Sequence, residues 1–552
     1  MSSFPDPVSE GLARGWKVLD AGDSALPARI DCDVAIVGTG AGGGISAEIL
    51  ARSGLRVLMI EEGPLKTSRD FNMREAEAYP QLYQESAARK TKDKAIGIMQ
   101  GRCVGGSTTV NWTSSFRTPA ATLAWWRDHY GLDDFSTEAL APWFAQVERR
   151  LSISPWLVPP NANNELLRRG ADKLGIDAPS ILRNVYGCLN LGYCGMGCPT
   201  NAKQSMLVTT VPAALEAGAT LCARARATRL EIEAGRVVAL DIDWLDAAGL
   251  RPSGRRTRVQ ATHYVLSGGS INTPALLLRS QAPDPHRLTG ARTFLHPVVV
   301  SAARFEQRVD GFAGAPQTIY SDHFLEQHPV DGPIGYKIEA PPIHPVLFAI
   351  TLSGFGQAHA QRMGDFAHMH ALIALMRDGF HPQAPGGRVE LRDDGSPVLD
   401  YPLTGFVLDG MRRALLSMAE LQFAAGAQEV LPVHERGAGY RSWPEARAAI
   451  SALPMEPLMP RVVSAHVMGG CAISADAGRG VVQPDGVHWQ LANVSVHDGS
   501  LFPTSIGANP QLSIYGITAR LAAGLAARLT GRPELATPAA MATTMAPPAG
   551  AA

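Results

Sequence analysis

The feature that most constrains this chain is a glycine turn between an apolar segment and a helical one. Residues 33–37 (DVAIV) have the composition of a buried strand, and residues 45–54 (ISAEILARSG) have helical spacing. Between them lie Gly38, Gly40 and Gly43. In this G-x-G-x-x-G pattern the glycines permit the tight turn, the approach of a pyrophosphate and close packing of helix on strand. The pattern predicts a dinucleotide-binding unit, with phosphates at the helix N-terminus.

A second apolar segment, residues 56–63 (RVLMIEEG), ends in carboxylates. Glu61 closes it at close to the spacing of about 20 residues expected of a carboxylate that holds a ribose hydroxyl. The alternative is a glycine-rich turn in a sheet without a ligand. The complete strand, turn, helix and strand order favours dinucleotide binding.

Length and charge exclude several classes of protein. A chain of 552 residues exceeds what one core accommodates, so we expect at least two domains. The net charge is −1 and charged residues make up 18% of the chain, which leaves no basic excess for a phosphate backbone. Nucleic-acid binding is therefore not expected. Hydrophobic residues at 45% indicate a globular protein.

Three further segments carry a family resemblance. They are Gly101–Asn111 (GRCVGGSTTVN), Gly268–Ser280 (GGSINTPALLLRS) and a C-terminal block that contains SAHVMGGC (464–471) and NVSVHDGSLFPTSIGANPQLSIYG (493–516). Together with the glycine turn, and in this order, they resemble the signature regions of the glucose-methanol-choline (GMC) flavoprotein oxidoreductases. The resemblance implies an α/β fold, with a Rossmann-type FAD-binding domain and a second, α+β domain of sheet and helices for the substrate.

This resemblance also divides the chain. The FAD-binding domain is expected from three separate parts, residues 1–114, 201–300 and 461–532. The substrate domain is expected from residues 115–200, which include a cysteine loop, and 301–460. Residues 533–552 are of low complexity and are expected to be disordered.

The resemblance assigns residues to FAD. It places Gly105, Gly106 and Ser107 beside the isoalloxazine or the pyrophosphate, and Asn111 near the reactive flavin edge. Ala227 falls where the adenine meets the backbone in this family. Asp498 matches a position beside FAD, although an Asp-Gly pair is also common in turns. Arg102, Gly499 and Pro510 complete the predicted set.

Two residues are predicted to carry the chemistry. His466 matches the catalytic histidine of the family, and Asn509 matches the second member of its His/Asn pair. A neutral imidazole can take a hydroxyl proton near pH 7, and an amide can hold the alcohol oxygen without adding charge. A helix after Pro510 would direct its positive end at the flavin. His296 and His344, each followed by proline, are expected to be structural.

Three cysteines cluster in a glycine-rich segment. Cys188, Cys194 and Cys198 have the spacing C-x5-C-x3-C-P. This spacing is similar to that of the iron-sulfur loop in bacterial FAD-dependent sugar dehydrogenases, which implies an iron-sulfur cluster, although one adjacent cysteine of those subunits is missing. Thiols that only pack, or a disulfide with one free thiol, are the alternatives. A zinc site would lack its fourth ligand.

The substrate is predicted from apolar segments in the second domain. Residues 338–356 (IEAPPIHPVLFAITLSGFG) and 369–376 (MHALIALM) predict an apolar channel, unless they are ordinary core. The whole pattern is similar to bacterial GMC dehydrogenases that act on medium- and long-chain aliphatic alcohols. We expect oxidation of such an alcohol to its aldehyde, with a non-oxygen acceptor. An oxygen-dependent oxidase, a sugar or polyol dehydrogenase subunit, and a flavoprotein without alcohol chemistry are the alternatives.

Location and partners follow from what the chain lacks. It starts without a recognisable signal peptide and has no apolar stretch of about 20 residues that could span a bilayer. We expect a cytoplasmic protein or one peripherally associated with the inner membrane, exported only with a signal-bearing partner. A small subunit, a cytochrome or a quinone would accept electrons.

Overall fold

The computed structural model describes residues 4–545. The predicted front unit forms β2 (Arg29–Val37), α2 (Ala41–Arg52) and β3 (Val57–Glu61). Strands β2 and β3 are parallel, with Val34 opposite Val57. All five residues of β3 are buried, as expected for a strand covered on both faces. The strand, turn, helix and strand prediction is confirmed.

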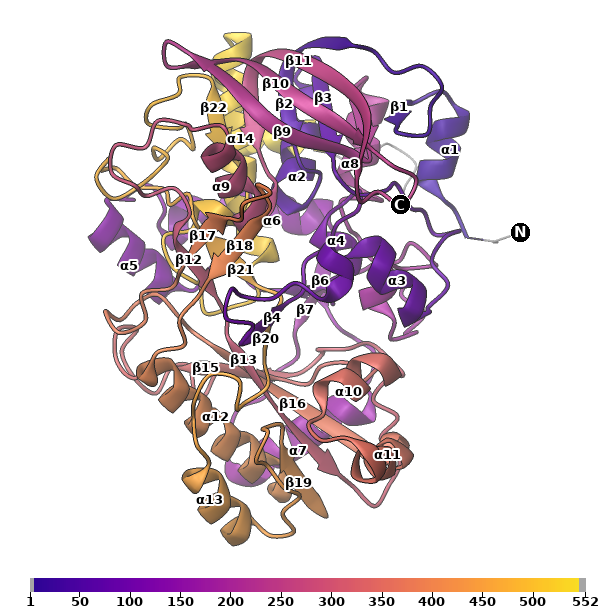
Figure 1. Ribbon diagram of the computed structural model, residues 1–552, viewed down its shortest axis with the longest axis vertical. Coiled ribbons are helices and arrows are strands. Elements are labelled where there is room, and N and C mark those ends of the chain that lie inside the picture. The colour runs from indigo at the N-terminus through magenta and orange to yellow at the C-terminus, as the bar shows by residue number, and fades with distance from the viewer. Residues whose placement is uncertain (1–3, 546–552) are drawn as a thin grey trace.

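An eight-stranded sheet is built around this unit from three distant parts of the chain (Figure 1). Its neighbouring strands run in the order β1 (Lys17–Asp20), β8 (Thr220–Ala223), β3, β2, β11 (Pro252–Leu266), β10 (Arg236–Leu245) and β9 (Ala225–Glu233), and β22 (Val494–Val496) pairs with β11. The long helix α14 (Gln511–Thr530) packs against α2. The helix predicted after Pro510 is therefore present.

A seven-stranded sheet forms the second half of the molecule, drawn at the bottom of Figure 1. Its order is β14 (Tyr320–Ser321), β15 (Tyr336–Glu339), β16 (Met369–Met376), β13 (Val298–Arg304), β20 (Val462–Ser464) and β4 (Ile96–Ile98), and β19 (Glu429–Pro432) pairs with β13. Alternate residues of β13 and β16 enter two separate hydrophobic clusters, so the sheet is buried on both faces.

Each face of this sheet has its own cover. On one face lie α7 (Ala162–Leu174) and α12 (Gly405–Ala424), the latter packed against α13 (Trp443–Ala452). On the other face, side chains of β13 and β16 cluster with Phe348 of the short helix α10 (Pro345–Thr351) and with Leu352. This second face borders the cavity described below.

Two smaller sheets and the remaining helices complete the fold. The four-stranded sheet has the order β18 (Pro397–Asp400), β17 (Gly387–Leu391), β12 (Ala291–Leu295) and β21 (Val467–Gly469), and the three-stranded sheet has the order β5 (Ser114–Ser115), β7 (Leu182–Asn184) and β6 (Ile153–Pro155). The other helices are α1 (Pro7–Ala13), α3 (Glu75–Leu82), η1 (Gln84–Ala87), α4 (Ser107–Val110), α5 (Ala120–Tyr130), α6 (Thr137–Arg150), η2 (Cys194–Met196), α8 (Thr210–Glu216), α9 (Gly269–Arg279), α11 (Gly356–Gly364), η3 (Phe366–His368) and η4 (Gly499–Leu501).

The two large sheets do not follow the predicted domain ranges at every point. Strands β4 and β20 belong to the second sheet, although residues 1–114 and 461–532 were both predicted to be FAD-binding. They pair in parallel, with Val462 opposite Ile96. Both strands are only three residues long, too short to produce a recognisable alternation in the sequence.

The C-terminal segment differs from its prediction. Residues 533–545 are ordered as η5 (Pro533–Ala536) and α15 (Pro538–Thr544), and Met541 and Met545 are buried. Thr537 caps α15 by accepting a hydrogen bond from the backbone N–H of Ala540. Disorder was therefore the wrong prediction for 533–545, because alanine and methionine provide a helical apolar face despite the low complexity. Residues 546–552 lie outside the described residues.

Among the helices in residues 4–545, none combines the length and the apolar character that crossing a bilayer requires.

Candidate active site

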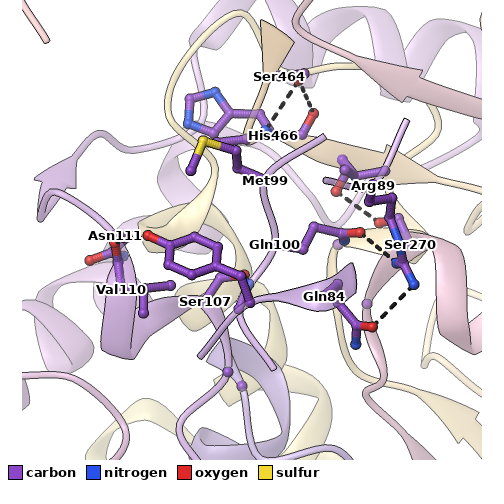
Figure 2. A pocket seen from close by; sticks show the side chains of 18 of the residues that line it. Gln84, Arg89, Met99, Gln100, Ser107, Val110, Asn111, Ser270, Ser464 and His466 are labelled. Atoms are coloured by element: carbon purple, nitrogen blue, oxygen red, sulfur yellow. Dashed lines mark hydrogen bonds between the residues drawn. The ribbon is translucent and has the colours of Figure 1, made fainter. Parts of the chain in front are cut away.

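A cavity of about 740 Å³ extends from the glycine turn of the first half to the sheet of the second half. Figure 2 shows part of it, with His466 and Met99 together, Asn111 and Val110 to one side, and Arg89 to the other. Its wall is contributed by segments that are hundreds of residues apart in the chain.

The glycine turn admits no side chains at its closest contacts. Gly38 has a positive φ of 96°. A Cβ on Gly43 would overlap the carbonyl oxygen of Gly38, and one on Gly42 would overlap the carbonyl oxygen of His497. Gly40, which precedes α2, lines the cavity. The N-terminus of α2 therefore opens into the cavity with its unpaired N–H groups and positive dipole.

Glu61 braces this turn. One carboxylate oxygen accepts hydrogen bonds from the backbone N–H of Thr39 (3.1 Å) and from its hydroxyl (2.6 Å). The other oxygen accepts from the N–H of Gly63 at 2.9 Å. Burial raises the pKa of the Glu61 carboxyl. Glu61 thus lines the cavity and also holds the glycine turn in shape.

Most residues predicted to bind the cofactor lie on the cavity wall. They are Gly38, Gly40, Glu61, Gly106, Ser107, Asn111, Ala227, Asp498, Gly499 and Pro510. The other three predicted residues contact residues of the wall. Gly43 packs α2 on the turn, and the N–H of Gly105 donates to the Thr39 hydroxyl at 3.0 Å. The guanidinium of Arg102 lies 3.5 Å from the Glu62 carboxylate.

Asp498 connects two elements at the cavity wall. One oxygen accepts hydrogen bonds from the N–H of Gly269 (2.8 Å) and the hydroxyl of Thr273 (2.6 Å), both in α9. The other oxygen accepts from the N–H of Ser500, and Asp498 thereby caps η4. Asp498 is therefore both the turn residue and the cavity-lining residue that the sequence left as alternatives.

The start of α14 is held against the cavity by side-chain amides. The amide of Asn111 donates to Oε1 of Gln511 at 2.6 Å, and Nε2 of Gln511 donates to the carbonyl oxygen of Ser114 at 2.8 Å. Asn111, Pro510 and Gln511 all line the cavity. The positive end of the α14 dipole therefore lies at the cavity wall.

The predicted catalytic histidine has a histidine partner. The Nδ1 atoms of His466 and His296 are 3.0 Å apart, and their rings meet edge to face. The backbone N–H of Gly507 donates to Nε2 of His296 at 3.2 Å. His296, which was expected to be structural, therefore contacts the candidate base directly.

One proton lies between the two Nδ1 atoms, and its position decides what His466 can do. When His466 holds it, Nε2 of His466 is free to accept a proton; when His296 holds it, that Nε2 carries hydrogen. The N–H of Gly507 favours a lone pair on Nε2 of His296, and hence the second arrangement at rest. His466 can therefore accept a proton at Nε2 only after the shared proton has moved to its own Nδ1. His296 thus determines the tautomer of His466.

Burial and charge keep His466 neutral. Burial and, to a smaller extent, the positive charge of Lys337 together lower the pKa of its imidazole to about 4. Lys337 is itself buried, lies over the rings of Phe116 and Tyr320, and pairs with Asp322 at 2.7 Å. At neutral pH His466 can therefore act as a proton acceptor.

Asn509, the second predicted catalytic residue, contacts a buried carboxyl group. Its Nδ2 donates to Oε2 of Glu339 at 3.3 Å, and the same oxygen accepts from Nε2 of Gln317 at 2.6 Å. Oδ1 of Asn509 has no hydrogen-bond partner among residues 4–545, and Asn509 lines the cavity. His466 and Asn509, predicted as a pair, thus line the same cavity.

Beyond His466 and Asn509 the cavity wall is apolar. The second sheet, α10 and the segments beside them contribute aliphatic and aromatic side chains, among them Val298, Val300, Ala302, Ile343, Leu347, Phe348, Leu352, Ala371, Ile373, Leu375, Val433 and Val463. Both segments that predicted an apolar channel, 338–356 and 369–376, contribute residues. The reading of these segments as core alone is therefore incomplete.

The three clustered cysteines do not form a metal site. Cys188, Cys194 and Cys198 are free thiols of intermediate exposure. Within residues 4–545, no three or more His, Cys, Asp or Glu side chains are arranged to hold a metal ion. The loop is organised by Lys203 instead, whose ammonium donates to the carbonyl oxygens of Cys194 (2.7 Å) and Asn111 (3.0 Å). The iron-sulfur prediction therefore has no support in the structure.

Sequence reasoning missed four residues of the site: His296, Gln317, Lys337 and Glu339. The two charged residues gave a weak signal, because they alternate with apolar positions in IGYKIEAPP (334–342), where both would be buried in a strand. A further cavity residue, the buried Arg89, donates to the amide oxygens of Gln84 and Gln100 (Figure 2).

Similar proteins place this geometry in a family. A long-chain-alcohol oxidase of Arabidopsis thaliana is 28% identical over 90% of this chain and 67% of its own length. An uncharacterized GMC-type oxidoreductase of Mycobacterium tuberculosis is 32% identical over 92% of this chain and 77% of its own. Formate oxidase of Aspergillus oryzae shares the fold, with a TM-score of 0.68 at 15% identity over 92% of this chain and all of its own.

The family models agree with these relatives. The N-terminal GMC oxidoreductase model matches residues 79–298, and the C-terminal model matches residues 382–518. The predicted family and the predicted fold class, an α/β dinucleotide-binding part with a second sheet-and-helix part, are therefore confirmed. The chain belongs to the GMC oxidoreductase family.

Proposed function

We propose that this protein is an FAD-dependent enzyme that oxidises medium- or long-chain primary aliphatic alcohols to aldehydes. The observation that carries the proposal is the single cavity that joins a dinucleotide-type glycine turn to His466 and Asn509 and continues along an apolar wall.

The residues present fit FAD. The turn at Gly38 and Gly40 leaves a cradle without side chains, beside the N-terminus of α2. Glu61 lines the cavity where a ribose hydroxyl would be held, and Ala227 lines it where the adenine is expected. Ser107, Asn111 and the start of α14 lie toward His466. Bound there, FAD would supply the acceptor for the hydride that leaves the alcohol carbon.

The side chains of the protein supply the proton chemistry. When the shared proton lies on Nδ1 of His466, its Nε2 is free to take the hydroxyl proton as the carbonyl bond forms. The Asn509 amide positions the alcohol oxygen beside it without adding charge. His296 holds the imidazole ring of His466, and the apolar wall excludes water from the reacting carbon.

The apolar wall supports an aliphatic substrate. A sugar or polyol would leave its hydroxyl groups unpaired against valine, leucine and phenylalanine side chains, at a cost of about 1–3 kcal/mol for each buried group. An alkyl chain gains about 0.8 kcal/mol for each methylene it buries. The names of the plant relatives, which are long-chain-alcohol oxidases, agree with this choice.

The names of the relatives, and not the cysteines, support a choice of electron acceptor. A non-oxygen acceptor was expected because of the cysteine loop, whose thiols are not arranged as a metal site in residues 4–545. The plant relatives are oxidases by name, which favours oxygen. Peroxide formed in proportion to alcohol consumed supports oxygen. Reduced flavin that persists in air indicates another acceptor, such as a quinone or a cytochrome at the inner membrane.

Replacement of His466 by alanine should leave a folded, FAD-containing protein that no longer reduces its flavin with alcohol. We expect the rate to fall by about 10² to 10⁴, the usual contribution of a general base. Anaerobic stopped-flow bleaching of the flavin by 1-dodecanol measures it. An unchanged rate would remove His466 from the proposed role.

Replacement of His296 by leucine should slow flavin reduction by about 10- to 100-fold, because the His466 ring loses its partner. His370 of β16 offers a matched control, since it is a buried histidine like His296 and contacts Gln422 of α12. His370→Leu should reduce stability while flavin reduction proceeds at the normal rate. An equal loss of flavin-reduction rate in His296→Leu and His370→Leu would indicate a structural role for His296.

Replacement of Lys337 by methionine should move the acid limb of the reaction to higher pH. The neutral form of His466 is the proton acceptor, so the rate should fall as pH drops through its pKa of about 4. Removal of the nearby positive charge raises this pKa, and the variant should lose activity at a less acid pH. An acid limb at the same pH in both proteins would contradict this electrostatic assignment.

Replacement of Ala371, on the apolar wall, by tryptophan should shorten the accepted chain. Each methylene that no longer fits costs about 0.8 kcal/mol, a factor of about four in kcat/KM. The loss should therefore grow with chain length between 1-hexanol and 1-dodecanol, while FAD content stays constant. A uniform loss for all alcohols would place the alkyl chain elsewhere.

A further inference from the structure

Glu339 is a buried carboxyl group that the proposed reaction does not use. It ends β15, its side chain has no exposed surface, and Oε1 has no hydrogen-bond partner among residues 4–545. Its other oxygen accepts from both Asn509 and Gln317. A buried polar atom without a partner is rare, and here it belongs to a group one hydrogen bond away from a candidate catalytic residue.

The hydrogen bond from Asn509 to Glu339 decides which end of the Asn509 amide faces the cavity. Because Nδ2 donates to Glu339, Oδ1 is left without a partner. An alcohol hydroxyl has one hydrogen, which His466 must receive. A carbonyl oxygen beside the alcohol competes for that hydrogen, whereas an N–H group would donate to the alcohol oxygen and stabilise its developing negative charge.

Protonation of Glu339 reverses this geometry. A carboxylic acid has an O–H that can donate to Oδ1 of Asn509, and the amide then turns its N–H groups toward the cavity. Gln317 still has an oxygen of Glu339 to donate to. We propose that Glu339 is a positioning residue whose protonation turns the Asn509 amide from a competing acceptor into a donor to the alcohol oxygen. This inference rests on the proposed alcohol oxidation.

The surroundings of Glu339 place its titration in an accessible range. Lys337, on the same strand, favours the carboxylate, and Asp322, in the segment after β14, favours the acid. Tyr320 of β14 lies opposite Glu339 in the sheet, and His466 lines the cavity with Asn509. Burial is the largest effect and raises the pKa of Glu339 to about 7.

The first experiment follows flavin reduction by 1-dodecanol from pH 5 to pH 9, anaerobically. Because the acid form of Glu339 is the productive one, the wild-type rate should fall above pH 7 by about tenfold for each pH unit. In Glu339→Gln, which cannot titrate, this alkaline limb should be absent.

In Gln317→Leu, the Glu339 carboxylate loses a hydrogen-bond donor, so the alkaline limb should move to higher pH. An alkaline limb near pH 7 that survives in Glu339→Gln, or stays in place in Gln317→Leu, overturns the proposal.

Asp378 provides the matched control. It is a second fully buried carboxyl with a raised pKa, about 8, and it is hydrogen-bonded to Tyr401. Asp378→Asn removes a titratable group of the same kind without contact to Asn509. The alkaline limb of the Asp378→Asn rate profile should match that of the wild type. If the alkaline limb of the rate disappears in Asp378→Asn as well, it reflects the overall charge of the core and not Glu339, and the proposal is overturned.

A second readout does not depend on activity. A carboxyl whose pKa is raised on folding stabilises the folded state below its unfolded pKa of about 4.5, and this stability is lost as pH rises through about 7. As pH rises from 4.5 to 7, the unfolding temperature of Glu339→Gln should therefore rise relative to that of the wild type. A constant difference would show that Glu339 takes no proton in this range and overturn the inference. A wild type that reduces no flavin with any alcohol, but shows this gain, would instead overturn the proposed function.

Discussion

The site depends on one backbone contact, between the first glycine turn and the segment that follows β22. The helix α2 approaches residues 497–498 so closely that a single methyl group on Gly42 would overlap the carbonyl oxygen of His497. Asp498 then ties this segment to the start of α9 through Gly269 and Thr273. Because these contacts are made by backbone and short side chains, they leave little freedom for the later C-terminal segment that carries Asn509.

A second constraint is the burial of several polar groups in an apolar surrounding. Asn509, Lys337 and Glu339 are buried and His466 is half-buried, in surroundings where a charge is costly unless it is paired. Lys337 is paired with Asp322 and lies over two aromatic rings. Burial and the nearby charge of Lys337 lower the pKa of His466, which is neutral at pH 7 as a result. The proton-accepting state of the site is therefore a consequence mainly of burial and secondly of where Lys337 lies.

The parts of the fold that the sequence predicted are those with local signals. The G-x-G-x-x-G turn and the helix after Pro510 each depend on residues close together in the chain, and both are present. The short strands β4 and β20 were not predicted, since three residues give no periodicity. The cysteine spacing suggested a cluster, but spacing alone does not set the direction of thiols in a loop that Lys203 organises.

By itself, the sequence determined the family, the dinucleotide-type turn, the cavity residues His466 and Asn509, and the apolar character of the second domain. Each of these is written in a contiguous motif or in local composition. Only the tertiary structure decided that His296 contacts His466, that Glu339 and Gln317 hold Asn509, and that Lys337 lies near enough to keep the histidine neutral. These partners come from separate strands and loops, and no local pattern specifies them, because the distance between two side chains from distant segments exists only once both sheets have packed.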